Sequence, residues 1–411
     1  MKPICTQTSS PATLAERTGA RIYLGEGSGA AFPHVAVKDG DAIQFGNCRL
    51  DFLQTPGHTA ESVSIVLTDL AAPLPSQPKA VFTGDTLFVG DVGRPDLSGS
   101  HTPQELAAML YSSLHEKVLK LPDEAEIFPA HGAGSLCGRQ MSSERSSTIG
   151  KERRTNYALL ARNPGEFIRL LTDRLPPRPE YFGKDVELNR RGATALEELP
   201  HPLPLRAPEI FRLQSEGAII LDSRPTMQFA VAHVPGSVHI ALSGQYASWA
   251  ARILGIDKRI ILVGEDADHL RESQMRLARV GIENVQAYLE DGIAGWIRGG
   301  YELDYIPQIS AQEFAELRKR ERDLIAVLDV REPGEVEMGA MEGSIRIPLG
   351  QLRDRIGELD RHKLVVVHCK SGYRSSIGTS LLRRAGFGDI ANLTGGFDAW
   401  KAAQDHSTST G

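Results

Sequence analysis

The sequence is poor in cysteine, with four residues in a chain of 411. These four are Cys5, Cys48, Cys137 and Cys369. They form no CxxC pair, so neither a disulfide framework nor a structural zinc finger is expected. Cys48 lies in a strand-like run and is expected in a hydrophobic core. The role of each other cysteine has to be judged from its neighbours.

An excess of charge of one sign is lacking as well. Lys and Arg total 46 against 52 Asp and Glu, a formal charge of −6, so the chain has no electrostatic footprint for nucleic acid. Its longest apolar runs, 323–329 and 361–368, are far shorter than the roughly 20 residues that span a bilayer. The N-terminus has no apolar h-region of a secretory signal. We therefore expect a cytoplasmic protein whose partners are small molecules or proteins, with a homo-oligomer left open.

What the chain does have is length and an internal repeat. With 41% hydrophobic residues in 411, it can form about three domains with real cores. Residues 207–303 and 306–402 follow one pattern, in which Ile220–Arg224 matches Val327–Arg331. Within each copy, short β-branched runs alternate with helical patterns, which predicts an α/β domain with a mainly parallel sheet.

The remaining sequence divides into three parts. Residues 1–162 have a different pattern of strand-like runs and form a separate predicted unit. Residues 163–206 are rich in Pro and Arg and offer one convincing helix, 165–174, so we interpret them as a linker. Residues 403–411 are expected to be a tail.

The last domain contains a loop suited to a reactive cysteine. Cys369 directly follows a buried-type strand and precedes a helix expected from Ser375. A loop between a strand and a helix N-terminus presents backbone N–H groups and the positive end of the helix dipole, and both stabilise a thiolate. Lys370 and Arg374 add positive charge. We therefore predict that Cys369 is a nucleophile.

This loop, C-K-S-G-Y-R-S at residues 369–375, resembles the active-site loop of rhodanese-type sulfurtransferases. The segments 329–332 and 395–400 resemble the rest of that family's pattern, with Ala340 as a departure where the family often has His. The resemblance implies a persulfide on Cys369, with Arg374 and Lys370 positioning an anionic sulfur donor or acceptor. The other members of the implied persulfide loop are Ser371, Gly372, Tyr373 and Ser375. A structural cysteine and a C-x5-R phosphatase, whose loop is one residue longer, are the alternatives.

The first copy of the repeat has no equivalent nucleophile. Aligning the two copies puts Gly264 at the position of Cys369, in a loop that carries Glu265, Asp266 and Asp268. Acidic side chains disfavour a thiolate. This copy therefore resembles an inactive rhodanese domain that serves as a spacer or docking surface. His233 and His239 have no third ligand at a suitable spacing, so we expect them to be ordinary loop histidines.

Three motifs in residues 1–162 each place a potential metal ligand just beyond a strand-like run. The ligands are His58 in T-P-G-H-T, Asp85 in F-T-G-D-T-L-F, and His131 in P-A-H-G. In this order the motifs resemble metal-binding motifs of the metallo-β-lactamase superfamily. The segments 91–96 and 146–153 narrow the resemblance to the persulfide dioxygenases, which are relatives of glyoxalase II.

The resemblance implies an αββα domain with a mononuclear non-haem Fe(II) held by two His and one Asp, which leaves positions open for O2 and substrate. Carried over by position, His58 and Asp85 are ligands, and His131 belongs to the neighbouring second-metal region. Arg94 is a candidate to bind the substrate's carboxylate. Cys137 is either a relay thiol that accepts sulfane sulfur or a passive loop cysteine.

The superfamily's first ligand comes from an H-x-H-x-D segment whose register here falls on residues 1–7. Lys2, Ile4 and Thr6 stand where His, His and Asp are expected. We therefore expect an N-terminally truncated domain, through a shortened gene, a misassigned start or degeneration. Since a facial triad needs three converging donors, the iron is expected to be weakly bound or absent. Cys5 is the one substitute donor nearby.

Together these features predict an α/β multidomain chain, an incomplete metallo-β-lactamase-like domain followed by two rhodanese-like domains. The predicted function is a persulfide dioxygenase–rhodanese fusion in sulfide and persulfide detoxification. It would oxidise glutathione persulfide, or the persulfide of another small thiol, to sulfite and transfer sulfur among persulfide, sulfite and thiosulfate. A glyoxalase-II-like thioesterase and a non-catalytic sulfur-carrier scaffold are the alternative functions.

Overall fold

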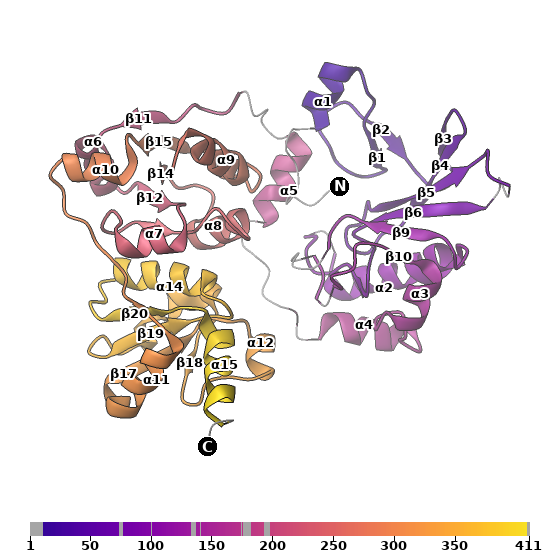
Figure 1. The fold of residues 1–411 in the computed structure, drawn as a ribbon. Helices are drawn as coiled ribbons and strands as arrows, with labels where there is room; N and C mark the ends of the chain where they lie inside the picture. Colours follow the sequence, from indigo (N-terminus) through magenta and orange to yellow (C-terminus); the bar gives the residue numbers. More distant parts are fainter. Residues whose placement is uncertain are drawn as a thin grey trace. The chain divides into compact units, whose positions relative to one another are not determined.

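A computed structural model describes residues 11–73, 77–99, 101–132, 137–139, 141–173, 175, 182–192 and 198–408. Two compact units are present, Met1–Ala195 and Leu196–Gly411 (Figure 1). The break between them falls inside the predicted linker. The register of the predicted H-x-H-x-D segment, with Cys5, lies outside the described residues.

The first unit is built on a six-stranded sheet. Its strand order is β10-β9-β6-β5-β4-β3, antiparallel throughout except where β6 pairs with β9 in parallel. The strands are β3 (Ala42–Phe45), β4 (Cys48–Gln54), β5 (Val63–Asp69), β6 (Pro78–Gly84), β9 (Glu126–Pro129) and β10 (Ser147–Thr148). Two short pairs accompany this sheet: β1 (Tyr23–Gly25) with β2 (Val35–Val37), and β7 (Leu87–Phe88) with β8 (Asp91–Val92).

The first unit also contains helices and short helical turns. They are α1 (Pro11–Thr18), α2 (Pro103–Ser112) with a π turn at Ser113–Lys117, a 3-10 turn at Val118–Lys120, α3 (Ile149–Thr155), α4 (Pro164–Thr172) and α5 (Phe182–Arg191). Thr102 begins α2 with a capping box that includes Glu105. The buried side chains of α2 meet Val81 and Ile127 of the sheet in one hydrophobic core.

Helix α5 corrects the sequence prediction, which found one helix in the stretch 163–206. Its polar sequence gives little sign of burial. Phe182, at its start, packs against a small cluster of Phe88, Leu97 and Cys137. Tertiary packing of this kind stabilises a helix that local propensity leaves marginal.

The second unit contains the two copies of the repeat, each with a five-stranded parallel sheet of the same order. The first sheet is β11-β15-β14-β12-β13 and the second is β16-β20-β19-β17-β18. In the first copy the strands are β11 (Leu203–Leu205), β12 (Ile219–Asp222), β13 (Val238–His239), β14 (Ile260–Val263) and β15 (Val285–Leu289). In the second they are β16 (Gln308–Ile309), β17 (Ile325–Asp329), β18 (Ile345–Arg346), β19 (Leu364–His368) and β20 (Ile390–Leu393).

Helices of the two copies also correspond. The first copy has α6 (Ala207–Ser215), α7 (Thr226–Val231), α8 (Tyr246–Leu254), α9 (Ala267–Ala278) and α10 (Gly292–Arg298). The second has α11 (Ala311–Arg320), α12 (Pro333–Glu337), α13 (Leu352–Arg355), α14 (Tyr373–Arg384) and α15 (Gly396–Thr408), with 3-10 turns at Arg322–Leu324, Leu349–Gln351 and Ile356–Glu358. The central strands β12, β14 and β17 are buried along their whole length, as expected for a parallel sheet covered on both faces.

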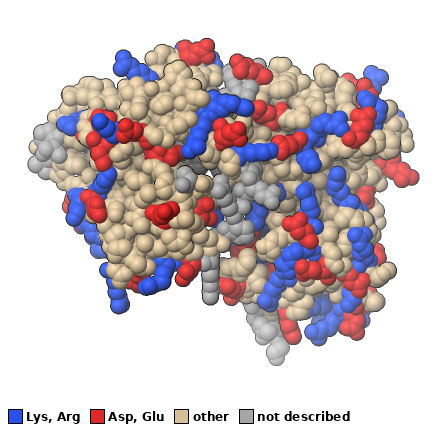
Figure 2. All heavy atoms as spheres, turned by 180° about the vertical axis from the view of Figure 1, so that it is seen from behind, with Lys and Arg blue, Asp and Glu red and all other residues tan. Residues whose placement is uncertain are grey.

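Within the described residues, no helix combines the length and apolar character that a bilayer crossing requires. On the face drawn in Figure 2, acidic and basic side chains are interspersed. Such mixing is typical of an ordinary solvated surface.

Candidate functional site

Cys369 lies between the end of strand β19 and the start of helix α14, as the sequence predicts. Its Sγ accepts a hydrogen bond from the Gly372 N–H at 3.1 Å, and the Ser375 hydroxyl lies 3.6 Å away as a further donor. Gly372 is the N-cap of α14 and has a φ of 110°, which a residue with a Cβ adopts only with strain. The loop therefore presents donors and a helix N-terminus to a buried sulfur, an arrangement that stabilises a thiolate.

The main chain of the Cys369 loop is fixed by the start of helix α15. The Cys369 carbonyl accepts a hydrogen bond from the Phe397 N–H at 2.7 Å, and the Lys370 carbonyl accepts one from the Asp398 N–H at 3.1 Å. A Cβ at Gly396 would lie 2.5 Å from the Cys369 oxygen. The glycine is needed here because the two backbones approach each other so closely.

The charges around Cys369 differ from those that the sequence predicts. Arg374 donates two hydrogen bonds to Glu335, at 2.5 and 2.7 Å, so its guanidinium is engaged with a carboxylate. Burial acts to raise the pKa of Glu335, but hydrogen bonds and charge from Arg374 hold that pKa below its ordinary value. Lys370 is exposed. Of the two loop cations, Lys370 therefore faces solvent, and Arg374 fixes the loop to α12.

The first copy of the repeat contacts the same loop. Tyr373 donates a hydrogen bond from its hydroxyl to the Ala241 carbonyl at 2.9 Å. His239 is fully buried, and its Nε2 lies 2.9 Å from the Arg224 carbonyl, which can only accept. Its Nδ1 therefore accepts the Ser376 hydroxyl, 2.8 Å away. Burial lowers the pKa of His239 to about 4, so the imidazole is neutral near pH 7. The expectation of an ordinary loop histidine is wrong, because His239 bridges the two copies.

The loop at Gly264, the counterpart of Cys369, borders a cavity of about 310 Å³. Glu265, Asp266 and Asp291 are among the residues that line it. Glu265 accepts a hydrogen bond from the Gln228 side chain at 2.6 Å. The acidic lining agrees with the interpretation that this copy does not hold a thiolate.

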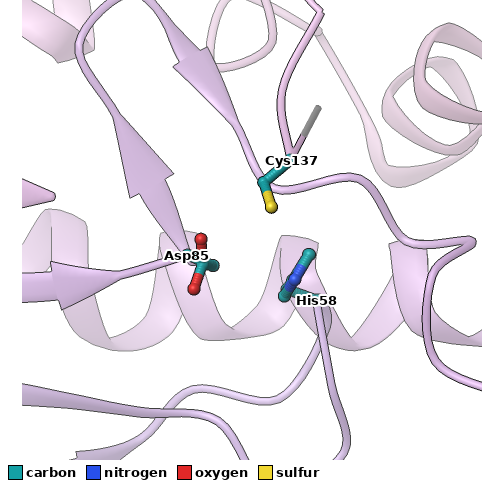
Figure 3. A group of neighbouring side chains, drawn as sticks. All are labelled: His58, Asp85 and Cys137. Carbon is teal, nitrogen blue, oxygen red and sulfur yellow. The ribbon is translucent and has the colours of Figure 1, made fainter. Parts of the chain in front are cut away.

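In the first unit, three buried side chains from loops that are distant in sequence lie close together. They are His58 after β4, Asp85 after β6, and Cys137 (Figure 3). One potential ligand atom from each lies within 4.8 Å of the other two. Two of these residues were predicted as metal ligands. The third, Cys137, was predicted as a relay or passive thiol.

The main chain of Arg94 forms hydrogen bonds with both His58 and Cys137. The Arg94 carbonyl lies 2.9 Å from His58 Nδ1 and can only accept, so Nδ1 carries the proton and Nε2 keeps its lone pair. The Arg94 N–H donates to the Cys137 carbonyl at 3.0 Å. The Arg94 side chain is buried and makes a two-bond ion pair with Asp96, at 2.7 and 3.0 Å. The guanidinium is thus engaged with Asp96, and the predicted contact of this side chain with a substrate stays a prediction.

Asp85 is the acidic member of the group. Burial raises the pKa of Asp85 to about 6 and lowers that of His58 to about 4. Oδ1 of Asp85 accepts no hydrogen bond from the described residues and lies 3.2 Å from His131 Nε2. His131 gives this buried oxygen one polar contact, and a bound cation would satisfy it more fully. A neutral imidazole, a carboxylate and a thiol are donors that divalent transition metals accept, so these residues fit a metal.

Comparisons with known proteins agree with this division of the chain. Residues 209–298 and 310–403 match the rhodanese-like domain family. "Persulfide dioxygenase ETHE1, mitochondrial" of Bos taurus is 34% identical over 155 residues, which are 38% of this chain and 52% of that protein. "Uncharacterized protein YqhL" of Bacillus subtilis is 37% identical over 101 residues, 24% of this chain and 76% of that protein.

A solved metallo-beta-lactamase from Staphylococcus aureus resembles the chain with a TM-score of 0.58 and 29% identity, over 68% of this chain and 79% of that one. Together these matches confirm the predicted fold class, a metallo-β-lactamase-like region followed by two rhodanese-like domains. The chain spans about half the length of the persulfide dioxygenases that it matches.

Proposed function

Because the chain belongs to the rhodanese-like proteins and carries an N-terminal region homologous to persulfide dioxygenases, we propose that it handles persulfide sulfur, with Cys369 as the transfer residue. The observation that carries this proposal is the hydrogen bond from the Gly372 N–H to Cys369 Sγ at 3.1 Å, at the N-terminus of α14. Such donors stabilise negative charge that develops on the sulfur during transfer.

The transfer itself needs no external oxidant or reductant. The Cys369 thiolate attacks the outer sulfur of thiosulfate, the S–S bond of thiosulfate breaks, and sulfite leaves with the electron pair. A nucleophilic acceptor such as sulfite or a thiolate then attacks the terminal sulfur of the Cys369 persulfide. This second step restores the Cys369 thiolate. A thiol persulfide serves as donor in the same way and leaves as the thiolate.

Residues around Cys369 divide the work of this transfer. Lys370 is exposed and attracts the anionic donor, while the Gly372 N–H stabilises charge on sulfur in both states. Arg374 holds the loop through its two bonds to Glu335. The first copy supports the same loop through Tyr373 and Ala241, which gives the domain without a nucleophile a structural function.

The metal-dependent half of the proposed function is oxidation of a small-thiol persulfide, such as glutathione persulfide, to sulfite. His58 and Asp85 would hold a ferrous ion, which supplies open positions where O2 and the substrate sulfur meet. His58 is kept in the required tautomer by the Arg94 carbonyl. The burial of His58 and Asp85 limits access of bulk water to their donor atoms.

A second candidate function, thioester hydrolysis at a two-metal site, rests on the contact between Asp85 Oδ1 and His131 Nε2 at 3.2 Å. An aspartate between two metal positions is what such a hydrolase requires. Measurement of bound metal per chain distinguishes the two candidate functions. The hydrolase needs two equivalents of metal per chain, and the dioxygenase needs one.

The proposed function is tested by assaying both activities on one preparation. Wild type, Cys369→Ser and His58→Ala are compared for thiosulfate-to-cyanide transfer and for O2 consumption with glutathione persulfide. Cys369→Ser is expected to lose transfer while keeping O2 consumption, and His58→Ala is expected to do the reverse. Equal transfer by wild type and Cys369→Ser would contradict the assignment of Cys369.

A further inference from the structure

We infer that Cys137 Sγ is a protein ligand of the metal held by His58 and Asp85, which makes the first unit a His–Asp–Cys site. The inference rests on the proposed function for the presence of a metal there. What it adds is the identity and the sulfur chemistry of a third donor. Figure 3 shows the three side chains converging on one space, with the sulfur of Cys137 directed toward the other two.

The spacing of the three donors suits a common ion. Their ligand atoms lie within 4.8 Å of one another. Bonds of about 2.0–2.3 Å to nitrogen, oxygen and sulfur put neighbouring ligands roughly 3–4 Å apart around a tetrahedral metal. The observed limit of 4.8 Å is close to this spacing, so the three donors are near enough to share one ion.

The backbone at Cys137 is anchored from two sides. The Cys137 carbonyl accepts a hydrogen bond from the Arg94 N–H at 3.0 Å. Two residues further on, the Arg139 N–H donates a hydrogen bond to Asp91 Oδ2 at 2.5 Å. Between them, Gly138 is confined, because a Cβ there would lie 2.8 Å from the same Asp91 oxygen. Polar contacts thus hold the main chain at the Cys137 carbonyl and two residues further on, at Arg139.

Arg139 extends this anchor to the end of helix α4. Its guanidinium donates to the carbonyls of Leu170, Leu171 and Asp173, at 3.0, 2.9 and 2.8 Å. Carbonyls at a helix C-terminus lack intrahelical partners, so this contact satisfies them and favours the arginine's charge. The short segment 137–139 is therefore positioned by the domain core, which is what a ligand site needs.

The alternative is that Cys137 only fills the apolar cluster with Phe88 and Leu97. That interpretation accounts for the burial of Cys137 but gives no role to its grouping with His58 and Asp85. Asp85 Oδ1 is buried and lies 3.2 Å from His131 Nε2 without hydrogen-bond geometry, in the same group as the thiol. A cation bound by carboxylate, imidazole and thiolate together satisfies that oxygen and uses all three side chains.

A thiolate changes the kind of metal that the site prefers. Two histidines and one carboxylate suit ferrous iron, whereas replacing one imidazole by a soft thiolate moves the preference toward zinc and cobalt without excluding iron. Ligation also deprotonates the thiol, so binding of the ion releases a proton. Both properties can be measured without any assay of activity.

Cobalt(II) alone is the probe that tests the inference. The full chain is stripped with a chelator and titrated with Co(II), and the near-ultraviolet sulfur-to-cobalt charge-transfer absorption is recorded. Wild type is expected to develop this absorption up to one equivalent. Cys137→Ala is expected to lose it and to bind Co(II) at least about tenfold more weakly. Zinc-loaded wild type should show one sulfur neighbour at about 2.3 Å by X-ray absorption.

Matched variants keep the result interpretable. Cys369→Ser and Cys48→Ala remove the other described thiols and should leave the absorption unchanged. Cys137→Ser is nearly isosteric, so it preserves packing and serves where Cys137→Ala fails to fold. Cobalt binding that His58→Ala abolishes but Cys137→Ser leaves unaltered would overturn the inference and keep the metal site. Absence of binding to wild type would overturn both the inference and the dioxygenase half of the proposed function.

Discussion

Glu335 and Arg374 form a two-bond ion pair beside the buried sulfur of Cys369, with N–O distances of 2.5 and 2.7 Å. This pair connects α12 to the first turn of α14, which ends the Cys369 loop. Arg374, which the sequence predicts to position an anionic substrate, therefore also fixes the loop to α12. We therefore expect the stability of the fold and the reactivity of the Cys369 thiol to depend on Glu335.

The ion pair predicts a pH-dependent stability. The pKa of Glu335 is lowered in the folded state, so its contribution is present above the unfolded pKa of about 4.5 and is lost as pH falls below it. At pH 7 the free energy of unfolding of Glu335→Gln should be about 1–3 kcal/mol lower than that of wild type, because the Arg374 charge loses its partner. Urea unfolding at pH 7 and pH 4 measures this difference. A difference that is as large at pH 4 as at pH 7 would count against the pair.

Gly372 predicts a coupled loss of stability and reactivity. Its φ of 110° makes Gly372→Ala strained by about 1–2 kcal/mol, and relief of that strain moves the N–H away from Cys369 Sγ. Alkylation of Cys369 by iodoacetamide at pH 7 should slow several-fold. The control is Gly388→Ala, where an added Cβ meets nothing within 4 Å. Equal alkylation rates in the two variants would contradict the role given to the Gly372 amide.

His239 predicts that the two copies stabilise each other. His239→Ala removes the partners of the Ser376 hydroxyl and the Arg224 carbonyl inside the protein. We expect a loss of about 1–3 kcal/mol in the free energy of unfolding of the second unit. His362, which is exposed, provides the matched control His362→Ala. If the two variants unfold at the same temperature in differential scanning calorimetry, the hydrogen bonds of His239 do not contribute to stability.

Asp185, on α5, predicts an opposite pH dependence in the first unit. Burial raises the pKa of Asp185 from 3.8 to about 7, and its Oδ2 accepts no hydrogen bond from the described residues. The folded state therefore holds the proton more tightly, so stability falls as pH rises from about 4 to 7. Asp185→Asn should be more stable than wild type at pH 8 by about 1–3 kcal/mol, and equally stable near pH 4. Thermal unfolding at both pH values tests this, and a wild type that gains stability toward pH 8 relative to the variant would refute it.

The sequence was sufficient for features that are local along the chain. The repeat, the buried strand before Cys369 and the helix after it follow from short patterns of β-branched and polar residues. His58 and Asp85, which the structure brings together, stand in motifs whose resemblance to metal-binding motifs predicts them as ligands. Except for the repeat, which needs a comparison of residues 207–303 with 306–402, each of these inferences needs only a few consecutive residues.

Features that depend on distant residues were missed or assigned differently. The partner of Arg374 is 39 residues away, and Ser376 and His239 are 137 apart. The grouping of Cys137 with His58 and Asp85 likewise depends on the fold. The carbonyl of Arg94 orients His58 through an atom that every residue possesses, so its side chain gives no signal in the sequence.

The central claim is that Cys369 carries sulfur as a persulfide. Purified wild type incubated with thiosulfate and then passed through a desalting column should show a mass increase of one sulfur atom by intact mass spectrometry. Addition of cyanide should remove the added sulfur atom as thiocyanate. Cys369→Ser should show neither the mass increase nor the formation of thiocyanate. A sulfur adduct that forms equally on Cys369→Ser, or no adduct on wild type, would contradict the account.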